Sequence, residues 1–429
     1  MSAVASLAQE LVDAILDFLH DDRASLLQSS LVARQWVPAT RYHLFQRITL
    51  SLVRHRGSTT GIRDTARPFL QLSRSPLCTM LPGIQDVLIA VQADWEAQLI
   101  QNIIELLGSS PIRKLLFIDM ESEPKPLAWI AQHFPHLREL VYNGTTHFLS
   151  DPLALVTSFP HLRSLSLFSR PSYLTTPCAF TDLSSPHSFH HLSTLQLRFL
   201  AAEVDKFIAW LLTLGDDAMH LETLDIVSFF EYHSGWGPVS NLNAFLKAQS
   251  KSLRTFRIQI KYEESDADIS DVERVSNISQ GDIDLSPLTK LETLYINQHH
   301  VAALLAALSS VSSPSIAAVE ISFKDWPYWE FNHPCSCRIP DQVVEFSELV
   351  AQDRFKTLTN LTVRVPEFTG RSPDEALEAY SPQWATRWAG TGVAHVLFLD
   401  EDRYPAGAME RDDVRAAMFG FLKETEQAE

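Results

Sequence analysis

Along the first fifty residues, hydrophobic positions recur with the spacing of an amphipathic helix. Leu7, Leu11, Ile15, Phe18 and Leu19 follow one another at steps of three and four. They therefore share one face of a helix that we expect from about residue 8 to about residue 20. That face is apolar throughout, so it needs another surface to pack against.

Two further helices are predicted next. Asp21 and Asp22 interrupt the apolar run and can cap a second helix, and Pro38 suits the first turn of a third, short helix. The apolar positions of the second helix are Leu26, Leu27, Leu31 and Val32. A unit of this length buries too little surface to be stable alone. Part of its apolar surface must therefore meet the rest of the chain or another protein.

From Ile84 onward a different pattern repeats: an apolar residue, two variable residues, an apolar residue, one variable residue and another apolar residue. The copies begin at Ile84, Ile112, Leu137, Leu162, Leu192, Leu221, Leu253, Leu291, Ile316, Leu358 and, more weakly, Val393. The last two apolar positions of each copy alternate with variable ones, which is the period of a strand that buries one face. Helical patterns separate the copies, so we expect parallel strands stacked in sequence order, with helices outside.

The predicted organisation is an α/β chain of three parts. Residues 1–50 form a three-helix module, residues 51–83 form a linker with a short helix, and residues 84–429 form an irregular solenoid with a C-terminal helical cap. In the solenoid the parallel strands line the concave face and the helices lie outside. An ordinary α/β domain is the alternative to a solenoid.

The N-terminal module resembles an F-box, which usually begins Leu-Pro-x-Glu-Leu, has a Leu-rich middle and ends Ser-Leu-Val-Cys-Arg-x-Trp. The matching positions are Leu7, Glu10, Leu11, Ile15, Leu16, Leu19, Ser30, Leu31, Val32, Arg34 and Trp36. The chain departs from the pattern at Ala8 and Ala33, where Pro and Cys are usual. By this resemblance, apolar helix faces of the module bind a groove on the Skp-family adaptor of a cullin-type ubiquitin ligase. The alternative is that these helices simply pack against a larger fold.

The resemblance implies a set of adaptor-binding residues. They are Leu7, Leu11, Ile15, Leu16, Leu19, Leu31, Val32 and Trp36. The later repeats are similar, more loosely, to leucine-rich repeats, although the Asn usual after the strand is mostly missing. An F-box followed by such repeats looks like the F-box proteins that serve as substrate receptors of SCF-type ligases, including those of mushroom-forming fungi. A scaffold that binds the adaptor without promoting ubiquitination is the alternative function.

If the repeats are strands, the variable positions beside the buried ones face outward on the concave surface. In the central repeats these positions hold a mixture of Arg, Asp, Gln, Tyr and Asn, which suits a protein partner held by hydrogen bonds and a few anchors. We take Arg198, Asp225, Arg257 and Tyr295 as the first candidates for target binding. A merely solvated sheet face is an equally simple interpretation of any one of them.

Composition narrows the choice of partner. The formal net charge of -17 argues against a nucleic-acid partner, which needs clustered Lys and Arg. The apolar start has no basic region before it, so it is a poor secretory signal, and no apolar run is long enough to span a membrane. Four scattered cysteines are too few for a disulfide scaffold. An intracellular protein, cytoplasmic or nuclear, is expected.

The sequence gives little sign of catalysis. It has no Gly-x-Ser-x-Gly, no phosphate-binding Gly-rich loop with Lys, and no Glu between helically paired His residues. His333, Cys335 and Cys337 could suggest zinc, but a tetrahedral site needs a fourth ligand and none is evident nearby. We therefore expect no enzyme activity, no cofactor and no metal.

Overall fold

The computed structural model describes residues 8–52, 64–76, 78–91, 97–120, 128–145, 159–170, 190–215, 219–230, 240–262, 283–297, 301–322, 349, 352–366 and 394–399. The chain divides into two compact units, residues 1–162 with 404–429, and residues 163–403. The boundary between the two units falls inside the copy that begins at Leu162, after its first apolar residue and before its strand. The repeat pattern therefore does not predict the boundary. The two units are described separately below.

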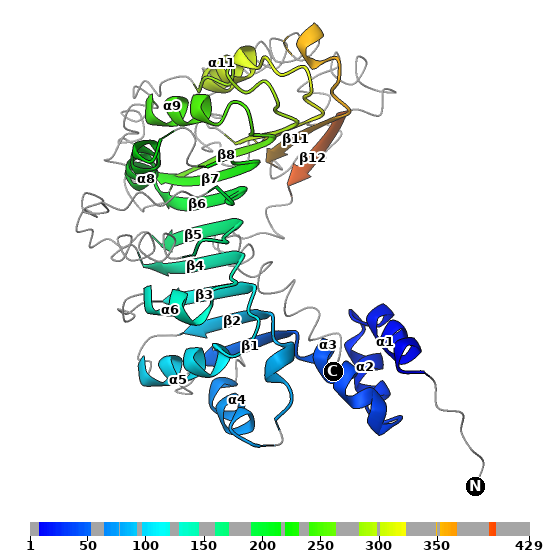
Figure 1. Ribbon diagram of the computed structural model, residues 1–429. Coiled ribbons are helices and arrows are strands. Elements are labelled where there is room, and N and C mark those ends of the chain that lie inside the picture. Colours follow the sequence, from blue (N-terminus) through cyan, green and yellow to red (C-terminus); the bar gives the residue numbers. More distant parts are fainter. Residues whose placement is uncertain are drawn as a thin grey trace. The chain divides into compact units, whose positions relative to one another are not determined.

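The first unit begins with three α-helices and a short 3-10 helix. They are α1 (Gln9–Phe18), α2 (Arg23–Ser29), η1 (Arg34–Trp36) and α3 (Val37–Leu44). We refer to α1 to α3 as the helical module (Figure 1). The helix expected at 8–20 is present as α1, and Asp22 caps α2 as expected, since its side chain accepts hydrogen bonds from Ser25 N at 3.0 Å and Ser25 Oγ at 2.6 Å. These bonds lower the pKa of Asp22.

The helical module has a small core of its own. Val12, Leu16, Leu26 and Leu44 are buried together, and Leu19, Trp36, Ala39 and Phe45 pack around them. A contact between Nε2 of His43 and Oδ1 of Asp17, at 3.0 Å, joins α3 to α1. The three helices are therefore held by one another as well as by their connections.

The rest of the first unit is a parallel sheet with helices between its strands. The strands are β1 (Arg47–Leu52), β2 (Asp86–Val91), β3 (Lys114–Met120) and β4 (Glu139–Thr145). They pair in that order, all parallel. The intervening elements are α4 (Ala66–Ser73), η2 (Leu81–Gly83), α5 (Ala97–Leu107) and α6 (Ala128–His133). Helix α5 packs against both α4 and α6, so the helices form a second layer (Figure 1).

Strand β1 is not among the elements that the sequence predicts, since residues 47–50 fall within the predicted helical module. It lies at the edge of the sheet of the first unit, where an unpaired strand would invite association with other chains. Thr65 covers part of this edge. Its Oγ1 accepts from Ser51 N at 2.8 Å and donates to the carbonyl of Thr49 at 3.0 Å, and its own N–H donates to the carbonyl of Ser51.

The second unit continues the pattern of parallel strands. Its strands are β5 (Ser164–Arg170), β6 (Thr194–Leu200), β7 (Thr223–Phe230), β8 (Thr255–Tyr262), β9 (Thr293–Asn297), β10 (Ala318–Ser322), β11 (Asn360–Pro366) and β12 (Ala394–Leu399). They pair in sequence order, all parallel. Between them lie α8 (Ala201–Thr213), α9 (Ser240–Ala248), α11 (Val301–Ser310) and η6 (Asp353–Phe355). Helix α8 packs against α9 and β6.

The strand prediction is confirmed copy by copy: each of the eleven repeats coincides with one of the strands β2 to β12. The inward rows of the second unit are apolar and aligned in register. One such row, Leu195, Leu224, Phe256 and Leu294, is fully buried. The chain thus has an α/β fold with open parallel sheets, an arrangement that fits a solenoid. Whether the helical module is an F-box stays a prediction.

Residues of alternating charge lie at the start of the four strands in the sheet of the first unit. Arg47, Asp86, Lys114 and Glu139 are aligned in register. Arg47 Nε lies 3.3 Å from Asp86 Oδ2, and Lys114 Nζ lies 2.9 Å from Glu139 Oε2. Because a shift of register would separate the partners of these ion pairs and move their side chains to the other face of the sheet, this row favours the observed pairing.

Burial raises the pKa of Asp86 despite the neighbouring Arg47 and Lys114. A raised folded-state pKa means that the protonated form favours folding below the ordinary aspartate pKa, and that this contribution is lost as pH rises through the raised value. We expect Asp86→Asn to remove this part of the fall in stability above about pH 4. Urea unfolding between about pH 4 and pH 7 tests this expectation, and an unchanged pH slope in the variant would contradict it.

Candidate functional site

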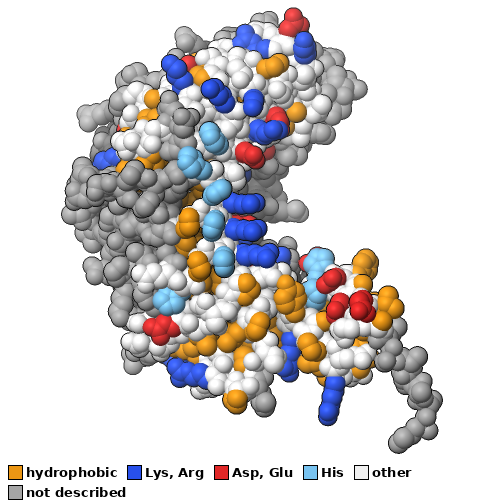
Figure 2. All heavy atoms as spheres, viewed as in Figure 1, with side chains coloured by type: hydrophobic (Ala, Val, Ile, Leu, Met, Phe, Trp, Pro, Cys, Tyr) orange, Lys and Arg blue, Asp and Glu red, His pale blue; other side chains and the backbone are white. Residues whose placement is uncertain are grey.

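Exposed apolar side chains are concentrated on the helical module. Eight large hydrophobic side chains are exposed among the described residues. Six of them lie between Leu11 and Val32, namely Leu11, Ile15, Phe18, Leu27, Leu31 and Val32. Phe18 and Leu31 are the most open, at 87% and 86% exposure. Figure 2 shows hydrophobic side chains at the surface of this part of the molecule, beside acidic ones.

Helix α1 carries two apolar stripes, which explains the exposure. Val12 and Leu16 face the core of the module and are fully buried. Leu11, Ile15 and Phe18 are spaced at steps of four and three on a different face and remain exposed. Only one stripe can face the core of a module this small, so the other stays available to another surface. We call these three residues, with Leu27, Leu31 and Val32, the apolar face.

The predicted adaptor-binding residues occupy three kinds of position. Leu11, Ile15, Leu31 and Val32 are exposed on the apolar face. Leu19 and Trp36 are half-buried and pack on the module core, while Leu7 lies outside the described residues. Leu16 is completely buried, so its assignment as a contact residue is corrected: it holds the module together and cannot touch a partner while the module is folded.

Two members of the apolar face were absent from the predicted set. Phe18 lies seven residues after Leu11, and Leu27 lies in α2. The spacing of Phe18 was visible in the sequence, but the F-box pattern has no fixed residue there. Leu27 could not be separated from its buried neighbour Leu26 by spacing alone, because one residue decides which side of α2 faces the core.

On the second unit, three of the four predicted target-binding residues meet. Asp225, Arg257 and Tyr295 are aligned in register on β7, β8 and β9. The guanidinium of Arg257 lies 4.3 Å from the centroid of the Tyr295 ring, and its Nε lies 3.9 Å from Oδ1 of Asp225. Stacking on the ring fixes the plane of the guanidinium and leaves donors at its edge for another group.

Electrostatics favour a charged Arg257. Burial opposes the charge of the guanidinium, but the carboxylate of Asp225 and the Tyr295 side chain outweigh this effect, so the pKa of Arg257 lies above its ordinary value. The Arg257 side chain is 47% exposed, whereas that of Asp225 is 9% exposed. Asp225 therefore positions Arg257 more than it faces solvent, and its role in target binding stays a prediction.

Arg198 belongs to a separate pair. Its guanidinium lies 4.7 Å from the centroid of the Phe168 ring on the neighbouring strand β5. In register Arg198 is aligned with Val227, and Gln196 is aligned with Asp225. The sheet of the second unit therefore carries two Arg side chains supported by aromatic rings. This arrangement can bind a partner, but it offers no nucleophile with a paired base.

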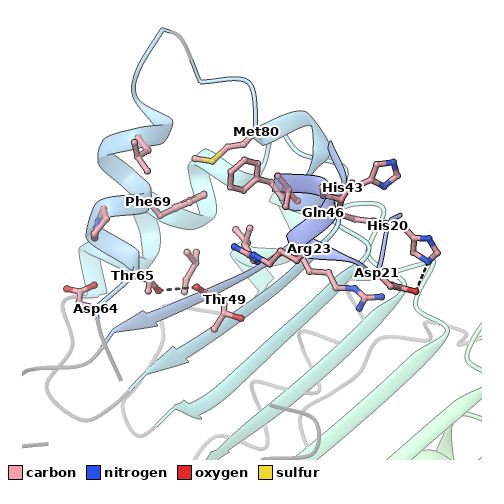
Figure 3. Close-up of a pocket in the computed structure, with 18 residues that line it drawn as sticks. His20, Asp21, Arg23, His43, Gln46, Thr49, Asp64, Thr65, Phe69 and Met80 are labelled. Carbon is pink, nitrogen blue, oxygen red and sulfur yellow. Dashed lines mark hydrogen bonds and ion pairs between the residues drawn. The ribbon is translucent and has the colours of Figure 1, made fainter. Parts of the chain in front are cut away.

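A cavity of about 560 Å³ lies in the first unit, between the helical module, β1 and α4 (Figure 3). Leu26, Phe69 and Met80 supply apolar walls, and His20 and Asp21 lie at its polar side. Nε2 of His20 contacts Oδ2 of Asp21 at 2.8 Å. The polar groups shown in the close-up do not converge on one point, so the cavity gives no candidate active site.

The described part of the chain contains no group of three or more His, Cys, Asp or Glu side chains that could hold a metal ion. His333, Cys335 and Cys337 lie outside the described residues. No described helix has both the length and the hydropathy needed to cross a membrane.

Comparison with known proteins gives no family. No model of a protein family matches the chain, and no curated protein is significantly similar to it. The F-box and leucine-rich-repeat assignments therefore rest on the residues themselves and on the exposure of the apolar face.

Proposed function

We propose that this chain is a substrate receptor of an SCF-type ubiquitin ligase. The helical module would bind a Skp-family adaptor, and through it a cullin, while the strand face of the repeats would bind a protein target inside the cell. The chain itself would do no chemistry, because its task is to hold the target where ubiquitin transfer becomes effectively intramolecular.

The observation that carries this proposal is the exposure of the apolar face. A single exposed Leu on a protein surface needs no explanation. Six large exposed apolar side chains on one small module with its own core do need one, since a concentration of exposed apolar surface marks a binding site. An amphipathic helix face placed in a partner's groove is a common mode of recognition.

The sheet of the second unit supports the target-binding half of the proposal. Arg257 and Tyr295 combine residue types that are enriched at binding hot spots, and Asp225 holds the guanidinium from the other side. Parallel strands space such side chains regularly, so a partner can contact several repeats at once. The chemistry of the target is indicated only by this mixture of charged and aromatic side chains on the sheet.

A binding assay with purified Skp-family adaptor tests the adaptor-binding half of the proposal. We expect the double variant Leu11→Asp, Ile15→Asp to lose at least about tenfold in affinity, because each apolar side chain buried on binding contributes roughly 1.5–3 kcal/mol. Both residues are exposed in the free module, so the variant should keep its circular dichroism spectrum. Immobilised adaptor and biolayer interferometry would give the affinities.

Leu72→Asp is the matched control, since Leu72 is 64% exposed on α4, outside the helical module. It should bind the adaptor like the wild type. A wild-type chain that does not bind, or a double variant that binds equally well, would reject the adaptor half of the proposal. If adaptor binding holds but the reconstituted ligase transfers no ubiquitin to proteins captured by the chain, the scaffold alternative is favoured.

A further inference from the structure

The cavity beside β1 is too large to be a packing defect. Its volume is about 560 Å³, whereas the interior of a protein is close-packed and has few voids larger than a water molecule. Pockets that bind small molecules have volumes of about 300–1,000 Å³. The size of this cavity therefore fits a binding pocket for a small molecule.

The walls of the cavity are apolar where they are most buried. Six of the lining residues are buried at 9% exposure or less, namely Leu26, Leu44, Ile48, Leu50, Phe69 and Met80. They come from the helical module, from β1, from α4 and from the segment before η2. Figure 3 shows the side chains of Phe69 and Met80 pointing into the space between α4 and the helical module. A hydrocarbon group that enters this space leaves water, which favours its binding.

The cavity follows the direction of β1. Residues 47–50 of that strand all line it, and a strand rises about 3.3 Å per residue, so this part of the wall is roughly 10 Å long. Asp64 and Thr65 lie at one side of the cavity, and His20 and Asp21 lie at the other (Figure 3). A long and narrow hydrocarbon chain suits this shape better than a compact ring.

The polar groups near α2 favour a ligand with an acidic group. Arg23 lies there beside His20 and Asp21 (Figure 3). Nε2 of His20 contacts Oδ2 of Asp21 at 2.8 Å, so these two side chains engage each other. Within the part of the chain that the structure describes, the side chain of Arg23 has no ion pair or hydrogen bond. Its guanidinium is therefore available for a carboxylate, which it can bind through two parallel N–H donors.

We propose that the cavity binds a long-chain carboxylic acid, with the hydrocarbon chain between β1 and α4 and the carboxylate at Arg23. A carboxylate carries one negative charge, which one guanidinium matches. A phosphate group carries nearly two charges, more than Arg23 compensates beside Asp21. A membrane surface attracts clusters of Lys and Arg, whereas this chain has a net charge of -17. A free acid is therefore the ligand that the cavity fits best.

The proposal does not rest on adaptor binding, because the cavity and the apolar face share no residue. The two sites can therefore be tested independently on the same chain.

Displacement of the fluorescent fatty acid cis-parinaric acid from the full chain tests the proposal. We expect saturable binding of one probe per chain. Oleate should displace the probe at least about tenfold more effectively than oleyl alcohol, because the alcohol lacks the charged hydrogen bonds of the carboxylate. Arg23→Gln should remove this difference and leave displacement by the alcohol unchanged. Met80→Trp should weaken both ligands at least about tenfold, because the larger side chain occupies part of the cavity.

Two control variants place the binding in the cavity. Arg74→Gln removes an exposed cation at the end of α4, outside the cavity lining, and should keep the preference for oleate. Leu11→Asp, Ile15→Asp changes the apolar face and should bind oleate like the wild type. Loss of oleate binding in that double variant would assign the fatty acid to the apolar face and overturn the proposal.

Other outcomes would also overturn it: no saturable binding, an undiminished preference for oleate in Arg23→Gln, or tighter binding of phosphatidylserine vesicles than of free oleate. If Met80→Trp unfolds, Leu72→Asp takes its place, since Leu72 lines the cavity and is 64% exposed. Unchanged oleate binding in Leu72→Asp would then count against the proposal. Adaptor binding measured on the same samples separates these outcomes from failure of the proposed ligase role.

Discussion

Leu16→Ala should destabilise the helical module by about 2–5 kcal/mol, the usual cost of removing a buried leucine side chain. Leu16 is 0% exposed and lies in one cluster with Val12, Leu26 and Leu44, so its loss leaves a cavity between α1, α2 and α3. Leu11→Ala should change the stability of the module by less than about 0.5 kcal/mol, because Leu11 is 55% exposed.

Hydrogen exchange resolved by peptide segments would measure this contrast. Exchange in the peptides of α1 and α3 should rise strongly in Leu16→Ala and stay near wild type in Leu11→Ala, while the peptides of β7 and β8 act as an internal reference. Adding Leu11→Asp to this comparison separates two ways of losing the proposed adaptor binding. Leu16→Ala would lose it by opening the module, and Leu11→Asp would lose it with the module intact. Equal exchange in the two alanine variants would show that the assignment of buried and exposed stripes is wrong.

In helix α1 the sequence predicts the helix but not which of its apolar residues are buried. Its apolar positions form two stripes, one through Val12 and Leu16 and the other through Leu11 and Ile15. Periodicity places residues on the same face, but it does not say which face packs on α2 and α3. That choice depends on tertiary contacts such as those of Leu26 and Leu44. The sequence could therefore predict the helix, and that the module has more apolar residues than it can bury. It could not predict that Leu16 is one of the buried ones.

The repeats were more predictable, since each strand is specified by three apolar positions at fixed spacing. The same spacing is present at Phe45, Ile48 and Leu50, which precede and form β1. This copy is hard to recognise in the sequence because the stretch follows the helical module directly, where Phe45 also fits the end of the predicted third helix. In the structure Phe45 does pack on the module core, so one residue serves both as the end of the module and as the start of the first repeat.

The register of the outward positions was also predictable. Asp225, Arg257 and Tyr295 occupy equivalent places in three successive repeats, and the structure aligns them in one row. Their degree of exposure was not predictable, because strand periodicity gives the face on which a side chain lies and not how much of that face solvent reaches. Asn297 and Gln259 are likewise buried on outward positions, at 2% and 7% exposure.

Phe256→Ala should cost about 3–5 kcal/mol in the second unit. Phe256 is fully buried on β8, and its register partners Leu224 on β7 and Leu294 on β9 are also fully buried. In stacked repeats each strand is stabilised by its neighbours, so the cavity should weaken β7 and β9 as well as β8. Because Arg257 and Tyr295 lie on β8 and β9, the contact between the guanidinium and the ring should loosen with them.

Arg254→Ala is the matched control beside β8. Arg254 Nη1 pairs with Glu292 Oε1 at 2.7 Å, but both side chains are about half exposed, so the pair contributes at most about 1 kcal/mol. Hydrogen exchange in the peptides of β7, β8 and β9 should rise in Phe256→Ala and not in Arg254→Ala, and exchange in the peptides of β2 and β3 should stay unchanged. A uniform rise across all these strands would instead mean that the two units unfold as a single cooperative block, because only then would a cavity in one unit be felt equally in the other.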